Sequence, residues 1–218
     1  MPAWAWWGLI AGGLCGLSWL YGRLSRQQAP AGNGPWDTSW AVYFSPNGGA
    51  THAILEAIRG AKYTILVHAY LLYSTRLAGG LVRAHQRGVQ VHVILDANAQ
   101  PHHPPVPAVA LLVAAGIAVS LDERHAWAHD KVMILDGEIV ITGSYNWTVA
   151  AEKHNGENLL VIRDPRLAGL YTENWRRHAH HSTPYRPTAP WWVRIRVVWV
   201  SLTRRRRKRL GSDIGEDG

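Results

Sequence analysis

The chain has 218 residues, 47% hydrophobic and 17% charged, which suffices for one compact domain with a sizeable core and excludes a long multidomain architecture. Its single cysteine, Cys15, excludes an internal disulfide and a cysteine-rich zinc site. The formal charge of +8 indicates an anionic partner, but residues 33–185 hold twelve basic and twelve acidic residues, so the whole excess lies in the flanks.

The first predicted element is an uncharged, tryptophan-rich stretch over residues 3–22, followed by Arg23 and Arg26. Its length and the arginines behind it predict a single-pass N-terminal transmembrane helix. A cleaved signal peptide is the alternative, because Ala29-Pro30-Ala31 is similar to a cleavage site, although no basic segment precedes the apolar run. We therefore assign residues 1–22 to an anchor or signal peptide and residues 23–39 to a polar linker.

Residues 40–185 form the predicted catalytic domain, in which short apolar runs alternate with helical periodicities. This alternation is typical of an α/β fold, here a mixed β-sheet flanked by helices. Asp164 followed by Pro165 marks the start of the last helix. The predicted strands cover residues 41–44, 63–70, 89–95, 117–121, 131–135, 138–142 and 159–162, and the predicted helices cover 51–61, 76–87, 109–115 and 165–178.

Residues 186–218 form a basic tail rich in Trp and Arg. Its apolar segment, residues 191–202, is interrupted by two arginines and is too short to span a bilayer. With the basic run that ends at Arg209, residues 191–209 are a second candidate membrane contact or a contact for nucleic acid phosphates. A disordered tail without a specific role is an equal alternative.

Chemistry-bearing residues gather between residues 129 and 157. His129 and Lys131 are two residues apart on a predicted strand, so their side chains project to the same face. Lysine stands here in a chain with nineteen arginines and four lysines, and a compact ammonium differs chemically from a guanidinium. Asp136 lies at the following hairpin turn. The next strand leads into Gly143-Ser144-Tyr145-Asn146, and Glu157-Asn158 opens the strand after it.

These residues resemble the signature of the phospholipase D superfamily, His-x-Lys-x4-Asp followed by Gly-Ser-x-Asn. The resemblance covers residues 40 to 180 and is greatest to the small bacterial endonucleases that carry a single copy of the motif. The mitochondrial cardiolipin hydrolase is also similar, but it carries a cysteine-rich zinc-binding element that a chain with one cysteine lacks. The resemblance implies a phospholipase D-like mixed sheet and a phosphodiesterase activity.

The implied mechanism uses a phosphohistidine. His129 is the expected nucleophile, and Lys131 offsets the charge of the phosphodiester. Ser144 and Asn146 are expected to donate hydrogen bonds to the nonbridging oxygens as charge develops. The resemblance implies that Glu157 orients an active-site imidazole by accepting its second N–H proton.

The leaving oxygen needs a general acid, and the resemblance implies that this acid is a second histidine from a second copy of the motif, of which the chain holds only one. We therefore expect a homodimer whose two-fold axis runs through the cleft, with His129 of each subunit meeting across the phosphate. A monomer should be inactive. Since Lys131 neutralises the charge, we expect no cofactor and no metal at the site. Asp136 is expected to be structural and to face away from it.

Other histidines carry less weight. His178, His180 and His181 cluster at the end of the last predicted helix, but no acidic residue is close in sequence, so the pattern does not favour a metal site. His68, on the predicted strand over 63–70, is expected to be a core residue.

Three functions follow from these observations. The leading one is a membrane-tethered, metal-independent phosphodiesterase acting on nucleic acid, against which stands the formally neutral catalytic domain. The second is a phospholipase D or cardiolipin hydrolase held at an anionic bilayer by the anchor and tail. The third, a phosphate-binding adaptor with a dead site, is disfavoured by the intact motif. The anchor predicts the bacterial inner membrane, with the domain cytoplasmic by the charge rule, or periplasmic if the N-terminal segment is cleaved.

Overall fold

The computed structural model describes residues 26–28, 39–99 and 106–186. The predicted anchor over residues 3–22 and the tail from residue 187 lie outside these ranges. Within them, no helix combines the length and apolarity needed to cross a bilayer. The chain divides into compact units at residues 1–184 and 185–218, and all the described helices and strands belong to the first unit.

The described strands form one mixed sheet of nine strands in the order β1-β2-β8-β7-β6-β3-β4-β5-β9. The neighbours β3, β4 and β5 run parallel, and the remaining pairs are antiparallel. The strand bounds are β1 Arg26–Gln28, β2 Ser39–Ser45, β3 Thr64–Ala69, β4 Gln90–Asp96, β5 Ala118–Asp122, β6 Lys131–Leu135, β7 Ile139–Gly143, β8 Glu157–Arg163 and β9 Thr183–Pro184.

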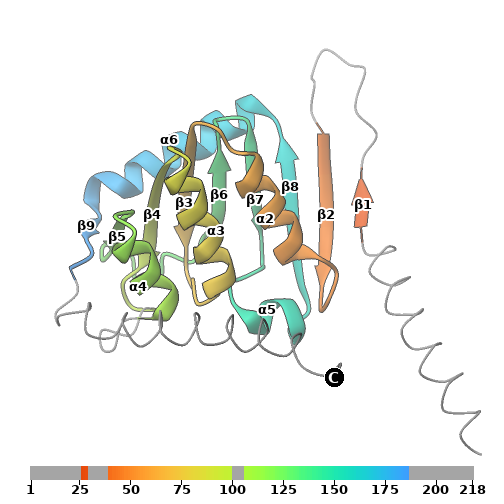
Figure 1. The fold of residues 1–218 in the computed structure, drawn as a ribbon, viewed down its shortest axis with the longest axis horizontal. Coiled ribbons are helices and arrows are strands. Elements are labelled where there is room, and N and C mark those ends of the chain that lie inside the picture. The colour runs from red at the N-terminus through yellow and green to blue at the C-terminus, as the bar shows by residue number, and fades with distance from the viewer. Residues whose placement is uncertain (1–25, 29–38, 100–105, 187–218) are drawn as a thin grey trace, which may run out of the picture. The chain divides into compact units, whose positions relative to one another are not determined.

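Helices cover both faces of this sheet (Figure 1). The helices α2, α3 and α4 lie on one face, the long helix α6 lies on the other, and the short helix α5 lies past the ends of the strands. The helix bounds are α2 Ala50–Gly60, α3 Thr75–Gln86, α4 Pro107–Ala114, α5 Val149–Lys153 and α6 Pro165–His181. The predicted class, a mixed sheet flanked by helices, is confirmed.

The packing of α6 defines which way the central strand β6 faces. Val132 and Ile134 on β6 form a buried cluster with Ala168 of α6. Because side chains alternate along a strand, Lys131 and Met133 project to the opposite face, the one covered by α2 and α3. The two faces of β6 therefore serve different helices.

The helix boundaries follow local signals. The Ser74 hydroxyl accepts a hydrogen bond from the Leu77 amide at the start of α3. Asp164 does the same for the amides of Arg166 and Leu167 at the start of α6. The predicted helix end at residue 178 was wrong. The helix α6 continues to His181, because no glycine or proline lies between His178 and Pro184.

Three short elements, β1, α5 and β9, are not predicted by the sequence pattern. Each is five residues or fewer, too short to show a period. The helix predicted over residues 109–115 begins two residues earlier, because Pro107 is the first residue of α4, a position where its missing N–H costs no hydrogen bond. The strand β8 begins at Glu157 rather than at residue 159, because β2 pairs with it as far as the Ser45–Glu157 pair.

Asp136 lies at the β6–β7 turn with a φ of 55°, in the left-handed region, and its carboxylate caps the start of β3. It accepts hydrogen bonds from the amides of Lys62 and Tyr63, both at 2.8 Å, and of Thr64 at 2.9 Å. Burial opposes ionisation of the carboxyl, but these amides outweigh it and lower the pKa of Asp136 below its ordinary value. The residue thus ties the hairpin to the neighbouring strand.

Substituting Asp136 with alanine should lower the free energy of unfolding at pH 7 by about 2 to 3 kcal/mol, because three amides lose a charged acceptor. A depressed folded pKa stabilises above the unfolded pKa, so the difference from wild type should shrink as pH falls below about 4. Denaturant titrations at both pH values measure this. The exposed Glu138→Ala, which loses only a surface ion pair with Arg163, is the control and should cost less than about 1 kcal/mol. Equal losses in both variants would contradict the capping role.

Candidate active site

Four central strands begin or end on the same side of the sheet, and the motif residues lie at these strand ends. β3 ends at Ala69, which pairs with Lys131 at the start of β6. β7 ends at Gly143, which pairs with Leu159 two residues into β8. Ser144 and Asn146 directly follow β7, and Glu157 begins β8. The antiparallel order β8-β7-β6-β3 therefore gathers segments as far apart in the sequence as Ala69 and Glu157.

His129 and Lys131 are in direct contact. The Lys131 ammonium donates a hydrogen bond to the His129 carbonyl oxygen at 2.8 Å, and its Nζ lies 3.2 Å from His129 Nδ1. Only 5% of Lys131 is exposed. Burial lowers the pKa of Lys131, while the charges of Asp130 and Glu157 act in the opposite direction. The histidine and lysine thus form a compact, partly desolvated pair.

An aromatic residue that the sequence analysis did not select completes this pair. The Tyr70 ring lies 4.4 Å from the His129 ring, centroid to centroid, and Lys131 Nζ lies 5.0 Å from the Tyr70 centroid. Trp127 packs edge-on against Tyr70 at 6.1 Å and is 61% exposed. Tyr70 follows β3, and nothing in its local sequence indicates that β3 pairs with β6, so its neighbours could not be predicted.

Ser144 and Glu157 form a second contact. The Ser144 hydroxyl donates to Glu157 Oε2 at 2.6 Å and accepts from the Asn158 amide at 3.1 Å. The other carboxylate oxygen accepts from Asn155 Nδ2 at 3.0 Å. Within the described residues, Glu157 makes no hydrogen bond to His129, although its charge acts on Lys131. The expected contact between Glu157 and an imidazole is thus not made in this single chain.

Tyr145, between Ser144 and Asn146, fixes this segment to the helices α5 and α2. Tyr145 is 1% exposed, and its hydroxyl donates to Glu152 of α5 at 2.7 Å and lies 2.8 Å from the Thr51 hydroxyl of α2. Asn146 has its Oδ1 buried without a hydrogen-bond partner among the described residues. An amide in this condition adds little to the fold through that atom and is free for another role.

Gly143 admits the close approach of β8 to this segment. Its φ is +150°, and a Cβ built there would lie 2.3 Å from the Asn158 carbonyl oxygen. Because the obstacle is backbone, β7 or β8 would have to move to make room. The position of the Ser144 hydroxyl depends on that close approach.

The Gly143→Ala variant should therefore lose at least about 100-fold in kcat and about 2 kcal/mol of stability, since the shift displaces Ser144. Steady-state hydrolysis and thermal unfolding measure the two effects. Gly156→Ala is the matched control, because a Cβ there meets nothing within 4 Å and it lies beside Glu157. A Gly143→Ala variant with wild-type kcat would contradict the steric argument.

The residue between His129 and Lys131 faces the other side of the sheet. The Asp130 carboxylate lies 3.2 Å from Nδ1 of His68, which is buried on β3. Burial lowers the pKa of His68 to about 4 despite the attraction of Asp130, so the neutral ring donates Nδ1–H to the carboxylate. His68 is in the core as expected, and Asp136 lies at the far end of β6 from Lys131.

Comparisons with known proteins agree with this architecture. The sequence model of the family described as "Cardiolipin synthase, PLD-like domain" matches residues 54–179. A protein named phospholipase D from Rickettsia bellii is 40% identical over 132 residues, which are 61% of this chain and 65% of that protein. The mitochondrial cardiolipin hydrolase of Xenopus laevis is 33% identical over 124 residues, 57% of this chain and 58% of its own. The chain thus spans less than two thirds of the length of these relatives.

Solved structures give the same result. Nuc from Salmonella typhimurium, titled a phospholipase D family member, superposes with a TM-score of 0.66 at 35% identity, over 68% of this chain and 99% of its own. NucT from Helicobacter pylori superposes with a TM-score of 0.62 at 19% identity, which shows the fold alone.

Proposed function

Because the chain belongs to the phospholipase D superfamily, whose members are phosphodiester hydrolases, we propose that it hydrolyses nucleic acid phosphodiesters without a metal at the catalytic site, through a phosphohistidine on His129. The observation that carries this proposal is the contact between His129 and the buried ammonium of Lys131, beside the hydrogen-bonded Ser144 and Glu157. A nucleophile, a fixed positive charge and a hydroxyl donor at one sheet edge are what phosphoryl transfer needs.

Substrate binding has to rearrange the contacts of the free site. While the Lys131 ammonium donates to His129 Nδ1, the ring carries its own proton on Nε2 and that nitrogen cannot attack. A phosphodiester oxygen is a stronger acceptor for Lys131 and for the Ser144 hydroxyl. When both turn to the substrate, Nδ1 can carry the proton and Glu157 is released from Ser144, so an imidazole can donate Nδ1–H to that carboxylate.

The reaction then proceeds in two balanced steps. His129 Nε2 forms a bond to phosphorus while the bond to the leaving oxygen breaks, and the leaving oxygen takes a proton from His129 of the partner subunit. Water then attacks the phosphohistidine, gives its proton back to the partner's His129, and releases Nε2. Lys131, Ser144 and Asn146 stabilise the charge that develops on the nonbridging oxygens in both steps.

A homodimer is part of this proposal, because the chain carries one copy of the His-x-Lys motif and the proposed reaction uses two imidazoles. It also offers Glu157 an imidazole from across the two-fold axis. Subunit mixing tests it: after full exchange with an equal amount of His129→Ala protein, only about one quarter of the randomly formed pairs hold two His129 side chains, so activity per total protein should be about one quarter of that of the wild type. Activity proportional to the wild-type fraction would contradict the shared site.

The exposed Trp127, next to Tyr70 and His129, supports the nucleic acid reading, because bases of single strands stack on such rings. The second candidate is hydrolysis of membrane phospholipids, cardiolipin among them, and the names of the relatives in Rickettsia bellii and Xenopus laevis favour it. For either substrate we propose attachment to the inner membrane through residues 3–22, with residues 191–209 as a further contact, or a periplasmic protein if the segment is cleaved.

The deciding experiment gives the full chain in detergent three substrates in parallel: plasmid DNA, single-stranded nucleic acid and cardiolipin vesicles. Excess EDTA is present and His129→Ala serves as the control. Nicking or degradation of nucleic acid by the wild type alone, with lipid spared, would support the proposal. Release of phosphatidic acid or free head group instead would establish the lipid hydrolase. Activity that EDTA abolishes while circular dichroism shows a folded chain, or that survives in His129→Ala, would overturn the mechanism.

A further inference from the structure

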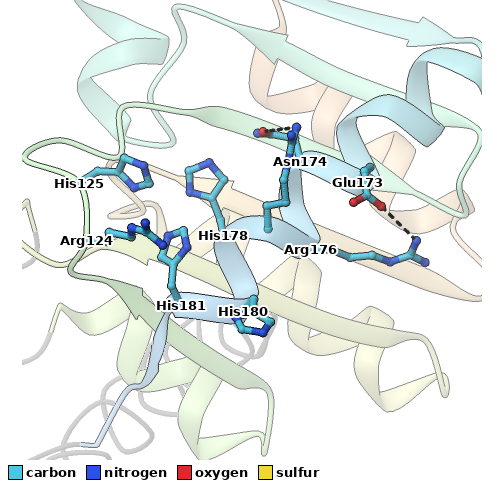
Figure 2. A pocket seen from close by; sticks show the side chains of 9 residues that line it. Arg124, His125, Glu173, Asn174, Arg176, His178, His180 and His181 are labelled. Carbon is cyan, nitrogen blue, oxygen red and sulfur yellow. Dashed lines mark hydrogen bonds and ion pairs between the residues drawn. The ribbon is translucent and has the colours of Figure 1, made fainter.

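Three histidines surround one buried carboxylate away from the motif residues. Asp122 is fully buried, and its Oδ2 lies 3.0 Å from Nδ1 of His125, 2.7 Å from Nδ1 of His178 and 3.3 Å from Nε2 of His181. One donor atom from each residue falls within 4.8 Å of all the others. Figure 2 shows His178 and His181 projecting from α6 beside His125.

Separate parts of the chain build this cluster. Asp122 ends β5, and His125 follows in the loop that leads to β6. His178 and His181 are three residues apart on the last turn of α6 and so share a face. Directly after α6, Thr183 of β9 pairs with Leu121, which holds the end of the helix against β5. The geometry is therefore fixed by backbone pairing, which the histidine pattern alone could not reveal.

The second oxygen of Asp122 is already engaged. Oδ1 accepts hydrogen bonds from the amides of Arg124 and His125, at 3.1 and 3.4 Å. The carboxylate is thus held with Oδ2 beside all three imidazoles, and Nδ1 of His125 also lies 3.1 Å from Oδ1. A fixed carboxylate oxygen among three imidazole nitrogens is a ligand set for a borderline-soft cation.

A neighbouring atom also lacks a partner. Nε2 of His68 is buried without a hydrogen bond among the described residues, and its ring centroid lies 4.4 Å from that of His178. Histidines that bind metal through one nitrogen usually donate the other N–H to a fixed acceptor. His68, which is itself oriented by Asp130, offers such an acceptor to His178.

We propose that Asp122, His125, His178 and His181 bind one divalent transition-metal ion, zinc in the first instance, in a closed four-ligand site. Tetrahedral zinc with bonds of about 2.0 to 2.2 Å separates its ligand atoms by roughly 3.3 Å, close to the separations from Oδ2 given above. An open pocket of about 660 Å³, lined in part by Arg124, His125, His178 and His181, gives the ion a path from solvent.

This site is structural and goes beyond the proposed function. It joins the loop between β5 and β6 to the end of α6, and that loop runs directly into His129. The cluster lies on the α6 face, whereas Lys131 projects to the other face, so the ion does not touch the reacting phosphate. Its removal therefore acts through stability rather than through the chemistry.

The test uses the full chain in detergent, stripped with a chelator that is then removed, and titrated with ZnCl2 or CoCl2. We expect about one ion per chain, the intense visible absorption of tetrahedral Co²⁺, and a rise of about 5 °C in Tm at saturating zinc. His178→Ala and the less buried His125→Ala should each weaken zinc binding at least about 100-fold. His180→Ala, exposed on the same turn of α6, is the matched control and should bind as wild type does.

The His125→Ala variant separates a loss of metal binding from a loss of the fold. Circular dichroism of His125→Ala reports the fold independently, because this side chain is 44% exposed and its loss leaves the core intact. Failure of the wild type to bind zinc or cobalt would overturn the proposal. So would stoichiometric binding that persists in both His178→Ala and His125→Ala, since the ion would then have other ligands. Neither result depends on hydrolysis, so the proposed function stands or falls separately.

Discussion

Replacing His129 with alanine is expected to lower kcat at least about 10⁴-fold, because under the proposed mechanism the variant loses the nucleophile and, in the proposed dimer, the general acid. Stability should change little, because the described hydrogen bonds of this side chain involve only Lys131. The direct measurement is trapping of the intermediate. Wild type quenched at alkaline pH during turnover of a labelled phosphodiester should carry acid-labile label, and the variant should carry none.

The control for this experiment is His154→Ala, an exposed histidine that directly follows α5. It should keep wild-type kcat and wild-type labelling. Label that persists in His129→Ala at a normal level would move the nucleophile to another residue. A small fall in kcat, of tenfold or less, would show that His129 only helps to place the substrate.

Replacing Lys131 with arginine is expected to lower kcat about 10³-fold although the charge is kept. Lys131 is 5% exposed, and its ammonium lies between the His129 carbonyl and the Tyr70 ring, where a planar guanidinium is too large. Burial also lowers the pKa of Lys131, which arginine cannot reproduce because it stays protonated. The Lys131→Met variant, of similar length but uncharged, should lose at least as much.

Lys153→Arg on α5 is the matched control for this pair of variants, because Lys153 is exposed. Kinetics for a cleavable diester should leave its kcat unchanged. If Lys131→Arg retained full activity, any cation of suitable charge would suffice at this position, and the argument from compactness would be wrong.

Much of the fold could be predicted because the signals in it are local. The helix α3 shows its buried stripe through Leu77 and Leu81, and α6 shows its start through Asp164 and Pro165. The turn at Asp136 and Gly137 marks the β6–β7 hairpin. Short elements such as β9 carry no such period, and their existence depends on a partner strand that is distant in sequence.

Some contacts of the candidate sites could likewise be predicted from local sequence, and others depend on pairings between distant segments. The pair of His129 and Lys131 follows from strand periodicity, and their contact is a local consequence of two-residue spacing. The link between Ser144 and Glu157 requires β7 and β8 to be neighbours, and the place of Tyr70 requires β3 to pair with β6. The meeting of Asp122 with His178 spans 56 residues and depends on α6 crossing the sheet. The local sequence predicts none of these pairings.

The tight turn at Asp136 and Gly137 has a consequence for evolution by insertion and deletion. Both residues have positive φ, and together with Glu138 they form the three-residue connection between the paired residues Leu135 and Ile139, which fixes the β6–β7 pairing. A side-chain period of two means that one added residue between this turn and Lys131 would send the lysine to the α6 face and bring Asp130 to the catalytic face. Two added residues would restore the parity. The number of residues between Lys131 and Asp136 thus determines which side chains lie on the catalytic face, although the turn itself is remote from that site.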